Sequence, residues 1–411
     1  MRLDRERLVF DPPAVAVAAN NSEEGSQQQS NKQRKKRSGG GMPNRGPVYC
    51  RSSSEARRDL QDKLLELYNR TTKSGFDAAV FPSGMCAIGA TLTSTISSWK
   101  QTPACPEFPI VVYGDELYCD VNRTVRYLQD TQGILGVKIN VCDDQQILDT
   151  FQRFGKEIRV FHWEGASNPS GQMLDVSLLP RLKKLAPHCV FVCDNTWLSG
   201  VTYNPLDYGA DIVVESMTKH LSGGTCIGGM ALGRRSSVQP VNNYIRVMGI
   251  FIDSERCELF SNQLGEGLRQ RVSRTAEAAL AVAEWLEKDD RVYRIDYPLL
   301  PSHRSYKVAC KVLKSDKIGP GCLWFQLPVS KSKLLDVVGV EETTPIEFKT
   351  SFGGPNSRVD PWPKAEDIQV EGKEKPIPGV WVRLALGYEE SGEQTIAKLE
   401  ALFNRLGVAS P

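Results

Sequence analysis

Short apolar segments alternate with helical patterns between residues 55 and 235, and this alternation constrains the fold more than any other feature of the chain. Residues 109–113 and 190–193 are almost entirely apolar, which is typical of strands that are buried on both faces. Similar segments predict strands at 78–81, 134–141, 158–161, 212–214 and 229–232, with helices at 55–69, from 84 onward and between most strands. Because parallel strands require such crossovers, we expect a large α/β domain with a mainly parallel sheet.

The last third of the chain follows a different pattern. One long helical pattern covers residues 261–288, and two strands, at 321–327 and 380–386, precede a final helix at 394–406. This order is typical of a smaller α+β domain, which we place at 255–411, after a large domain at 47–254. Residues 1–46 contain polar and glycine-rich stretches and are predicted to form a disordered, low-complexity tail.

Composition narrows the classes of partner. The formal net charge of +2 over 411 residues gives no reason to expect nucleic acid or an acidic membrane, and no apolar run reaches membrane-spanning length. A basic run at 35–37 has the character of a nuclear or nucleic-acid signal, but the rest of the chain offers no matching basic surface, which favours a solvated tail. The eleven cysteines form no CxxC or CxxH pair, so we expect no metal site, and reduced thiols in a cytoplasmic protein.

Residues 211–220 indicate where the chemistry begins. They read DIVVESMTKH, so a buried strand ends in two hydroxyls, Ser216 and Thr218, followed by Lys219. A lysine in this position can bind a cofactor aldehyde as a Schiff base, and the hydroxyls can hold a phosphate beside it. Asp194 follows the strand expected at 190–193 and can keep a pyridine nitrogen protonated. Together these residues point to pyridoxal phosphate (PLP).

Two further groups meet the remaining needs of that cofactor. Ser83, Gly84 and Met85 open a helix after a strand, so their backbone N–H groups can point at a phosphate. Tyr118 lies beyond the strand at 109–113 and can present an aromatic face to the ring. Taken singly, each residue also fits a structural role: Asp194 a turn or helix cap, the Ser-Gly pair a plain helix start, and Tyr118 a packing residue. Their combination favours the cofactor site.

The order of these motifs along the chain resembles one family of enzymes. Over residues 47–408 the chain looks like the Cys/Met-metabolism PLP enzymes, the group of cystathionine γ-synthase, cystathionine β-lyase and γ-lyase. The resemblance implies the PLP-dependent transferase fold of the aspartate-aminotransferase-like class (fold type I). It is carried by Tyr49-x-Arg51, Ser83-Gly84-Met85, Tyr118, Glu164-x-x-x-Asn168-Pro169, Asp194-Asn195-Thr196, Ser216-x-Thr218-Lys219, Ser351-x-Gly353-Gly354 and Arg383-Leu384-x-x-Gly387.

The resemblance implies a role for each cofactor-binding residue. Lys219 would be the Schiff-base lysine and proton shuttle, and Asp194 would pair with the pyridinium. Tyr118 would stack on the ring and assist proton transfer, so Lys219 and Tyr118 are the expected catalytic residues. The expected phosphate ligands are Gly84, Met85, Ser216 and Thr218.

It also implies a substrate clamp and a shared site. Arg383, with Ser351, would bind the substrate α-carboxylate, a task for which the planar guanidinium is well suited. Taken alone, Arg383 would be a surface charge at a strand edge. Asn168 would contact the ring hydroxyl or the substrate carboxylate. Tyr49 and Arg51 would reach the phosphate of a neighbouring subunit, which implies a homodimer or homotetramer with shared active sites.

The expected function is therefore PLP-dependent elimination or replacement at the β or γ carbon of a sulfur-containing or O-activated homoserine-type amino acid, as in transsulfuration. The alternatives are a cystathionine β-lyase or a specialised enzyme for a non-standard amino acid, because residues 52–55 and 223–226 and Thr350 depart from the family pattern. A non-catalytic paralogue is a third alternative, and the presence of Lys219, Asp194, Tyr118 and Arg383 argues against it.

Overall fold

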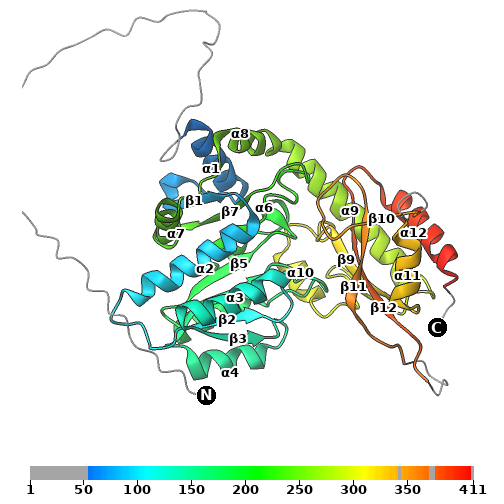
Figure 1. Ribbon diagram of the computed structural model, residues 1–411, viewed down its shortest axis with the longest axis horizontal. Helices are drawn as coiled ribbons and strands as arrows, with labels where there is room; N and C mark the ends of the chain where they lie inside the picture. Colours follow the sequence, from blue (N-terminus) through cyan, green and yellow to red (C-terminus); the bar gives the residue numbers. More distant parts are fainter. Residues whose placement is uncertain (1–53, 341–343, 370–374, 409–411) are drawn as a thin grey trace, which may run out of the picture. The chain divides into compact units, whose positions relative to one another are not determined.

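A computed structural model describes residues 54–340, 344–369 and 375–408 (Figure 1). The tail expected at residues 1–46, and with it Tyr49 and Arg51, lies outside the described residues. Within these ranges, none of the helices combines the length and the apolar character needed to cross a membrane.

The larger sheet has seven strands and is mainly parallel, as the sequence predicts. Its order is β1-β7-β6-β5-β4-β2-β3, and only β7 runs antiparallel to its neighbours. A parallel sheet brings the carboxyl ends of its strands to one edge, where ligands of such folds bind. The strands are β1 (Phe76–Phe81), β2 (Ile110–Gly114), β3 (Leu135–Ile139), β4 (Ile158–Glu164), β5 (Val190–Asp194), β6 (Ile212–Glu215) and β7 (Gly229–Arg234).

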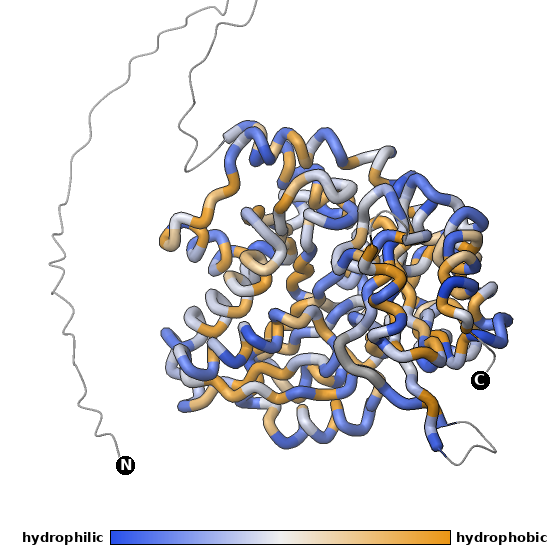
Figure 2. Tube along the Cα trace, turned by 45° about the vertical axis from the view of Figure 1, so that its right-hand side comes forward, coloured by the Kyte–Doolittle hydropathy of each residue, from blue (hydrophilic) through white to orange (hydrophobic). Residues whose placement is uncertain are grey.

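Helices cover both faces of this sheet, which explains the continuous apolar character of its strands. Val160 and Val192 face a core shared with α2 and α7, whereas Phe161 and Cys193 face a core shared with α4 and α5. In Figure 2, hydrophilic and apolar residues alternate along the covering helices, as amphipathic helices require. The helices are α1 (Glu55–Leu67), α2 (Gly84–Lys100), α3 (Cys119–Gln132), α4 (Asp144–Phe154), α5 (Leu179–Leu185), α6 (Ser199–Thr202) and α7 (Arg235–Met248), with short 3₁₀ turns at Thr72–Ser74, Val176–Leu178 and Pro205–Asp207.

A second, smaller sheet follows, with the order β10-β11-β12-β9-β8. It confirms the expected α+β character of the C-terminal part, while the domain boundary at 254/255 stays a prediction. The strands are β8 (Arg294–Asp296), β9 (Cys322–Leu327), β10 (Glu347–Phe348), β11 (Arg358–Ala365) and β12 (Val380–Ala385). The helices are α8 (Ser254–Gln263), α9 (Glu266–Lys288), α10 (Tyr306–Val312), α11 (Lys331–Val338) and α12 (Gly392–Leu406).

The single helix predicted for residues 261–288 was wrong at its start. The structure has two helices there, because α8 ends at Gln263 and α9 begins at Glu266. Gly265 lies between them with φ of 89°, a backbone conformation that no right-handed helix contains. A glycine inside a helical pattern was the local signal for this break.

Candidate active site

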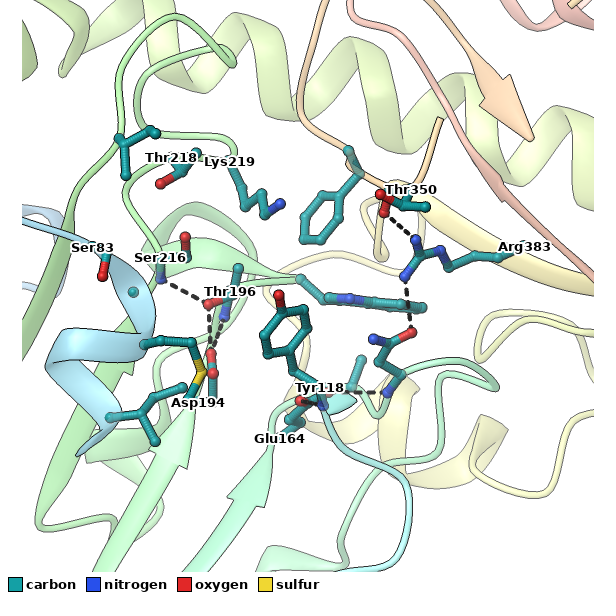
Figure 3. A pocket seen from close by; sticks show the side chains of 18 residues that line it. Ser83, Tyr118, Glu164, Asp194, Thr196, Ser216, Thr218, Lys219, Thr350 and Arg383 are labelled. Carbon is teal, nitrogen blue, oxygen red and sulfur yellow. Dashed lines mark hydrogen bonds between the residues drawn. The ribbon is translucent and has the colours of Figure 1, made fainter. Parts of the chain in front are cut away.

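A cavity of about 250 Å³ lies beyond the carboxyl ends of β4, β5 and β6 (Figure 3). Glu164 and Asp194 end the first two strands, and Ser216 follows the third. The cavity walls contain nine of the residues predicted from the sequence: Gly84, Met85, Tyr118, Asn168, Asp194, Ser216, Thr218, Lys219 and Arg383. Residues far apart in the chain, from α2 to β12, therefore meet at the edge of the sheet where the sequence predicts the site.

Lys219 projects its amine into a largely buried environment. A turn after β6 positions the residue, and Nζ donates a hydrogen bond to Ser351 Oγ at 2.8 Å. The same Nζ lies 5.0 Å from the centroid of the Phe352 ring. Burial first, and then the nearby charge of Arg383, lower the pKa of the Lys219 amine to about 8. A useful fraction of this amine is therefore uncharged near neutral pH, as a nucleophile or base requires.

Asp194 is buried, and one of its oxygens is already engaged. Oδ1 accepts hydrogen bonds from the backbone N–H of Thr196 at 2.9 Å and from its hydroxyl at 2.5 Å. Thr196 Oγ1 in turn accepts from the backbone N–H of Ser216 at 2.8 Å, which ties the end of β5 to the end of β6. Burial raises the pKa of Asp194 to about 6. A cation such as a protonated pyridine nitrogen would stabilise the charged form, with Oδ2 as its acceptor.

Glu164 holds the two loops that frame the cavity, a role that the sequence analysis missed. Its Oε1 accepts from the backbone N–H of Tyr118 at 2.6 Å, and its Oε2 accepts from that of Asn168 at 3.0 Å. Burial first, and then the charge of Asp194, raise the pKa of this carboxyl well above its usual range. A carboxyl at the end of an apolar strand was the available signal, and it is the same signal that revealed Asp194.

The amino end of α2 forms the candidate phosphate site. Ser83 caps the helix, because its Oγ accepts from the backbone N–H of Cys86 at 3.1 Å, and the helix start lines the cavity beside Ser216. At Gly84 a Cβ atom would lie 2.7 Å from Ser216 Cβ, so only glycine fits this approach. The Thr218 hydroxyl donates to Gly228 O at 3.2 Å and accepts from Gly228 N at 3.1 Å, so its role toward a phosphate stays a prediction.

Arg383 lies in the middle of the smaller sheet, and its position excludes the alternative of a surface charge at a strand edge. It is buried on β12, between β11 and β9. Nη1 donates to Asn168 Oδ1 at 3.1 Å, and Nη2 donates to Asp360 Oδ2 at 2.7 Å and to the carbonyl oxygen of Thr350. Nε is buried and has no hydrogen-bond partner among the described residues, whereas Arg383 as a whole lines the cavity.

Contacts of Ser351 and Asp360 bear on the expected clamp. Ser351 was predicted to bind the substrate carboxylate with Arg383, and this stays a prediction; in the structure its Oγ accepts from Lys219 Nζ. Asp360 was not predicted at all, although it faces Arg383 across the β11–β12 pair. That pairing depends on the register of two strands and leaves no signal in the local sequence.

These groups fit PLP. A helix start that only glycine can form, a buried carboxylate at the end of β5 and a lysine with a lowered pKa lie in one cavity with an aromatic ring. They correspond to the phosphate, the pyridine nitrogen, the aldehyde and the ring face of that cofactor.

Comparison with known proteins agrees with this chemistry. An O-succinylhomoserine sulfhydrylase of Pseudomonas aeruginosa is 28% identical over 284 residues, which cover 64% of this chain and 61% of that protein. The cystathionine β-lyase of Neurospora crassa is 27% identical over 355 residues, which cover 84% of this chain and 71% of that protein. The crystal structure of cystathionine γ-synthase from Xanthomonas oryzae, in complex with aminoacrylate and cysteine, has a TM-score of 0.72 at 22% identity and 87% coverage of both chains, which shows the fold.

The family model described as Cys/Met metabolism PLP-dependent enzyme matches residues 16–403, which is most of the chain. The expected fold type and cofactor are thereby confirmed. The protein described above belongs to the Cys/Met metabolism PLP-dependent enzyme family.

Proposed function

We propose that this enzyme catalyses elimination or replacement at the γ carbon of a sulfur-containing or O-activated homoserine-type amino acid. One observation carries the proposal: the cavity that contains the Lys219 amine also contains the Asp194 carboxylate and the Arg383 guanidinium. A base, a counter-charge for the cofactor and a carboxylate-binding group are the groups that this chemistry requires.

The described residues have distinct tasks toward the cofactor. Asp194 would hold the protonated pyridine nitrogen, the start of α2 and Ser216 would hold the phosphate, and Tyr118 would cover the ring. When bound, PLP supplies an electron sink for the negative charge that develops at the substrate α carbon. Burial raises the pKa of Tyr118, so its phenol stays protonated and can donate a hydrogen bond.

The substrate would be held by groups that are already in position. Arg383 would bind the α-carboxylate through its guanidinium, with Asn168 beside it. Lys219 would take the α proton, which requires the neutral amine that its lowered pKa provides. A leaving group on Cβ could then depart directly, whereas one on Cγ requires removal of a second proton from Cβ. Lys219 Nζ is the candidate base for that step as well.

A second candidate function is β-elimination, as in the cystathionine β-lyase relative, whose match covers 84% of this chain. We also propose a homodimer or homotetramer in the cytoplasm, in which Tyr49 and Arg51 contribute to a neighbouring site. The support is the motif that these two residues share with the family.

A product screen tests the proposed reaction. The PLP-loaded protein is offered cystathionine, cysteine, methionine and O-acetylhomoserine separately, each with and without added cysteine. Formation of 2-oxobutyrate or a new thioether supports γ chemistry, and pyruvate from cystathionine supports the β-lyase. The variant Lys219→Ala is the control and should form none of these products. If the yellow, PLP-loaded protein forms no product from any of these amino acids, the proposed function is wrong.

A further inference from the structure

Each charged side chain that lines the cavity already has a role in the proposed binding of the cofactor and of the substrate α-carboxylate. Within the described part of the chain these side chains are Glu164, Asp194, Lys219 and Arg383. Glu164 holds two backbone N–H groups, Asp194 serves the pyridine nitrogen, and Lys219 serves the aldehyde. Arg383 serves the α-carboxylate. None of these four charges is left for a charged group at the far end of a substrate.

A fifth charged residue, Arg358, lies near Lys219 but does not line the cavity. Arg358 contributes to the lowered pKa of Lys219. Its Nη2 lies 3.9 Å from Glu347 Oε2, its guanidinium packs close to Gly354, and its Nε is buried with no hydrogen-bond partner among the described residues. An anionic substrate arm would therefore meet no available cation among the described cavity residues.

The remaining wall beside the reactive amine is aromatic and apolar. Trp197 and Phe352 meet edge to face with ring centroids 6.0 Å apart, and both are almost fully buried. Phe352 also faces the Lys219 amine. Both rings line the cavity that contains Lys219 and Arg383, the two residues that would hold the reacting end of the substrate. Apolar groups and thioether sulfur pack favourably against such rings.

We propose that this site takes amino acids whose arm beyond Cγ is uncharged, such as a methyl thioether or a neutral acyl ester. Substrates that end in a second carboxylate, a phosphate or a second ammonium group are excluded by the cost of burying an unpaired charge. The inference rests on the proposed function, because it assumes that Lys219 and Arg383 hold the reacting end of the substrate.

Binding of unreactive analogues tests the preference directly. L-Norleucine, L-2-aminoadipate and L-ornithine have chains of equal length that end in a methyl, a carboxylate and an ammonium group. Binding to the PLP-loaded protein is followed by the change in the visible absorption band and by calorimetry, so that no turnover is needed. We expect norleucine to bind at least about tenfold more tightly than either charged analogue. Equal or tighter binding of a charged analogue would overturn the proposal.

A positive charge introduced into the cavity wall should weaken the preference for the uncharged analogue over the anionic one. Thr350 lines the cavity with an exposed side chain, and its contact with Arg383 uses the backbone carbonyl, which a substitution retains. Thr350→Lys should tighten 2-aminoadipate binding at least about fivefold and leave norleucine within about twofold. Leu135→Lys is the matched control, because Leu135 is exposed and begins β3, at the end of the strands opposite the cavity. If both variants change 2-aminoadipate binding equally, the wall is not responsible and the proposal fails.

Turnover separates this proposal from the proposed function. O-Acetylhomoserine and O-succinylhomoserine differ by a distal CH2–COO⁻ group. In each, the cysteine thiolate can replace the acyloxy group at Cγ, so that the Cγ–O bond breaks, a Cγ–S bond forms, and acetate or succinate leaves together with the thiol proton. We expect a kcat/KM at least about tenfold higher for the acetyl ester. A preference for the succinyl ester would contradict the proposed selectivity for an uncharged arm and would leave the proposed γ reaction intact. Tight norleucine binding without turnover of either ester would support the proposed selectivity and would contradict the proposed γ reaction.

Discussion

The reactivity of Lys219 depends on a free-energy difference that can be measured. Burial and the Arg383 charge lower the pKa of its amine from the ordinary value of 10.5 to about 8. A shift of this size corresponds to about 3 kcal/mol against the charged form. At pH 7 about one amine in ten would be neutral, compared with about one in 3000 for an ordinary lysine. The buried site therefore increases the concentration of the reactive amine by roughly 300-fold.

Competitive labelling of the cofactor-free protein measures this pKa. A trace of acetic anhydride reacts only with neutral amines, and mass spectrometry of the digest reports each lysine separately. Labelling of Lys219 should rise about tenfold per pH unit up to about pH 8 and then level off. Exposed Lys184 gives the reference profile in the same digest.

A substitution at Arg383 tests the cause of the shift. Arg383→Met removes a positive charge and leaves the Asp360 carboxylate beside the site, so the labelling midpoint of Lys219 should move to higher pH. Arg294→Met is the control, because Arg294 is a largely exposed residue of β8 outside the cavity, and the midpoint should not move. If Lys219 labelling still rises tenfold per unit above pH 9 in the wild type, burial does not activate this amine and the reasoning is wrong.

Three substitutions of residues around Lys219 give the remaining predictions. Asp194→Asn should lower kcat at least about a hundredfold, because the amide cannot keep the pyridine nitrogen protonated. The same change should stabilise the cofactor-free protein in urea unfolding at pH 7 but not below pH 4, because the raised pKa makes the folded state less stable as pH rises from about 4 to about 6. Gly84→Ala should weaken PLP binding at least about tenfold in absorbance titrations, because its Cβ would clash with Ser216. Asp360→Asn should raise KM about tenfold with little change in kcat, because Arg383 would lose its ion pair across the sheet, and an equal loss in kcat would contradict this.

The parts of the site that lie at strand ends were predictable from the sequence. Asp194 ends, and Lys219 follows, a strand that is apolar on both faces, and a parallel sheet brings such strand ends together whatever the loops do. Gly84 and Ser83 follow the same rule, since a helix that begins directly after a strand must begin at that edge. For these residues the local pattern already contains the information about spatial position.

The site residues that were not predicted from the sequence depend on contacts between distant segments of the chain. Phe352 meets Trp197 and Lys219 only because the loop before β11 packs against the larger sheet. β11 itself was not predicted, because Pro361 and Pro363 interrupt the alternation that indicates a strand. Without β11 there was no register, and without a register Asp360 could not be paired with Arg383.

The cost of burying charged side chains explains why Arg383 and Asp194 indicate the function. A strand such as β12 is buried at every position, so an arginine within it has to be paired and hydrogen-bonded to be tolerated. Asp360, Asn168 and the Thr350 carbonyl meet most of that requirement, but Nε is left without a partner among the described residues. Asp194 is also a buried charge, and it accepts two hydrogen bonds through Oδ1 at the cavity wall. A fold that only had to be stable would replace both residues with apolar ones, whereas a fold that has to bind a carboxylate and a pyridinium needs both of these charged groups at the cavity.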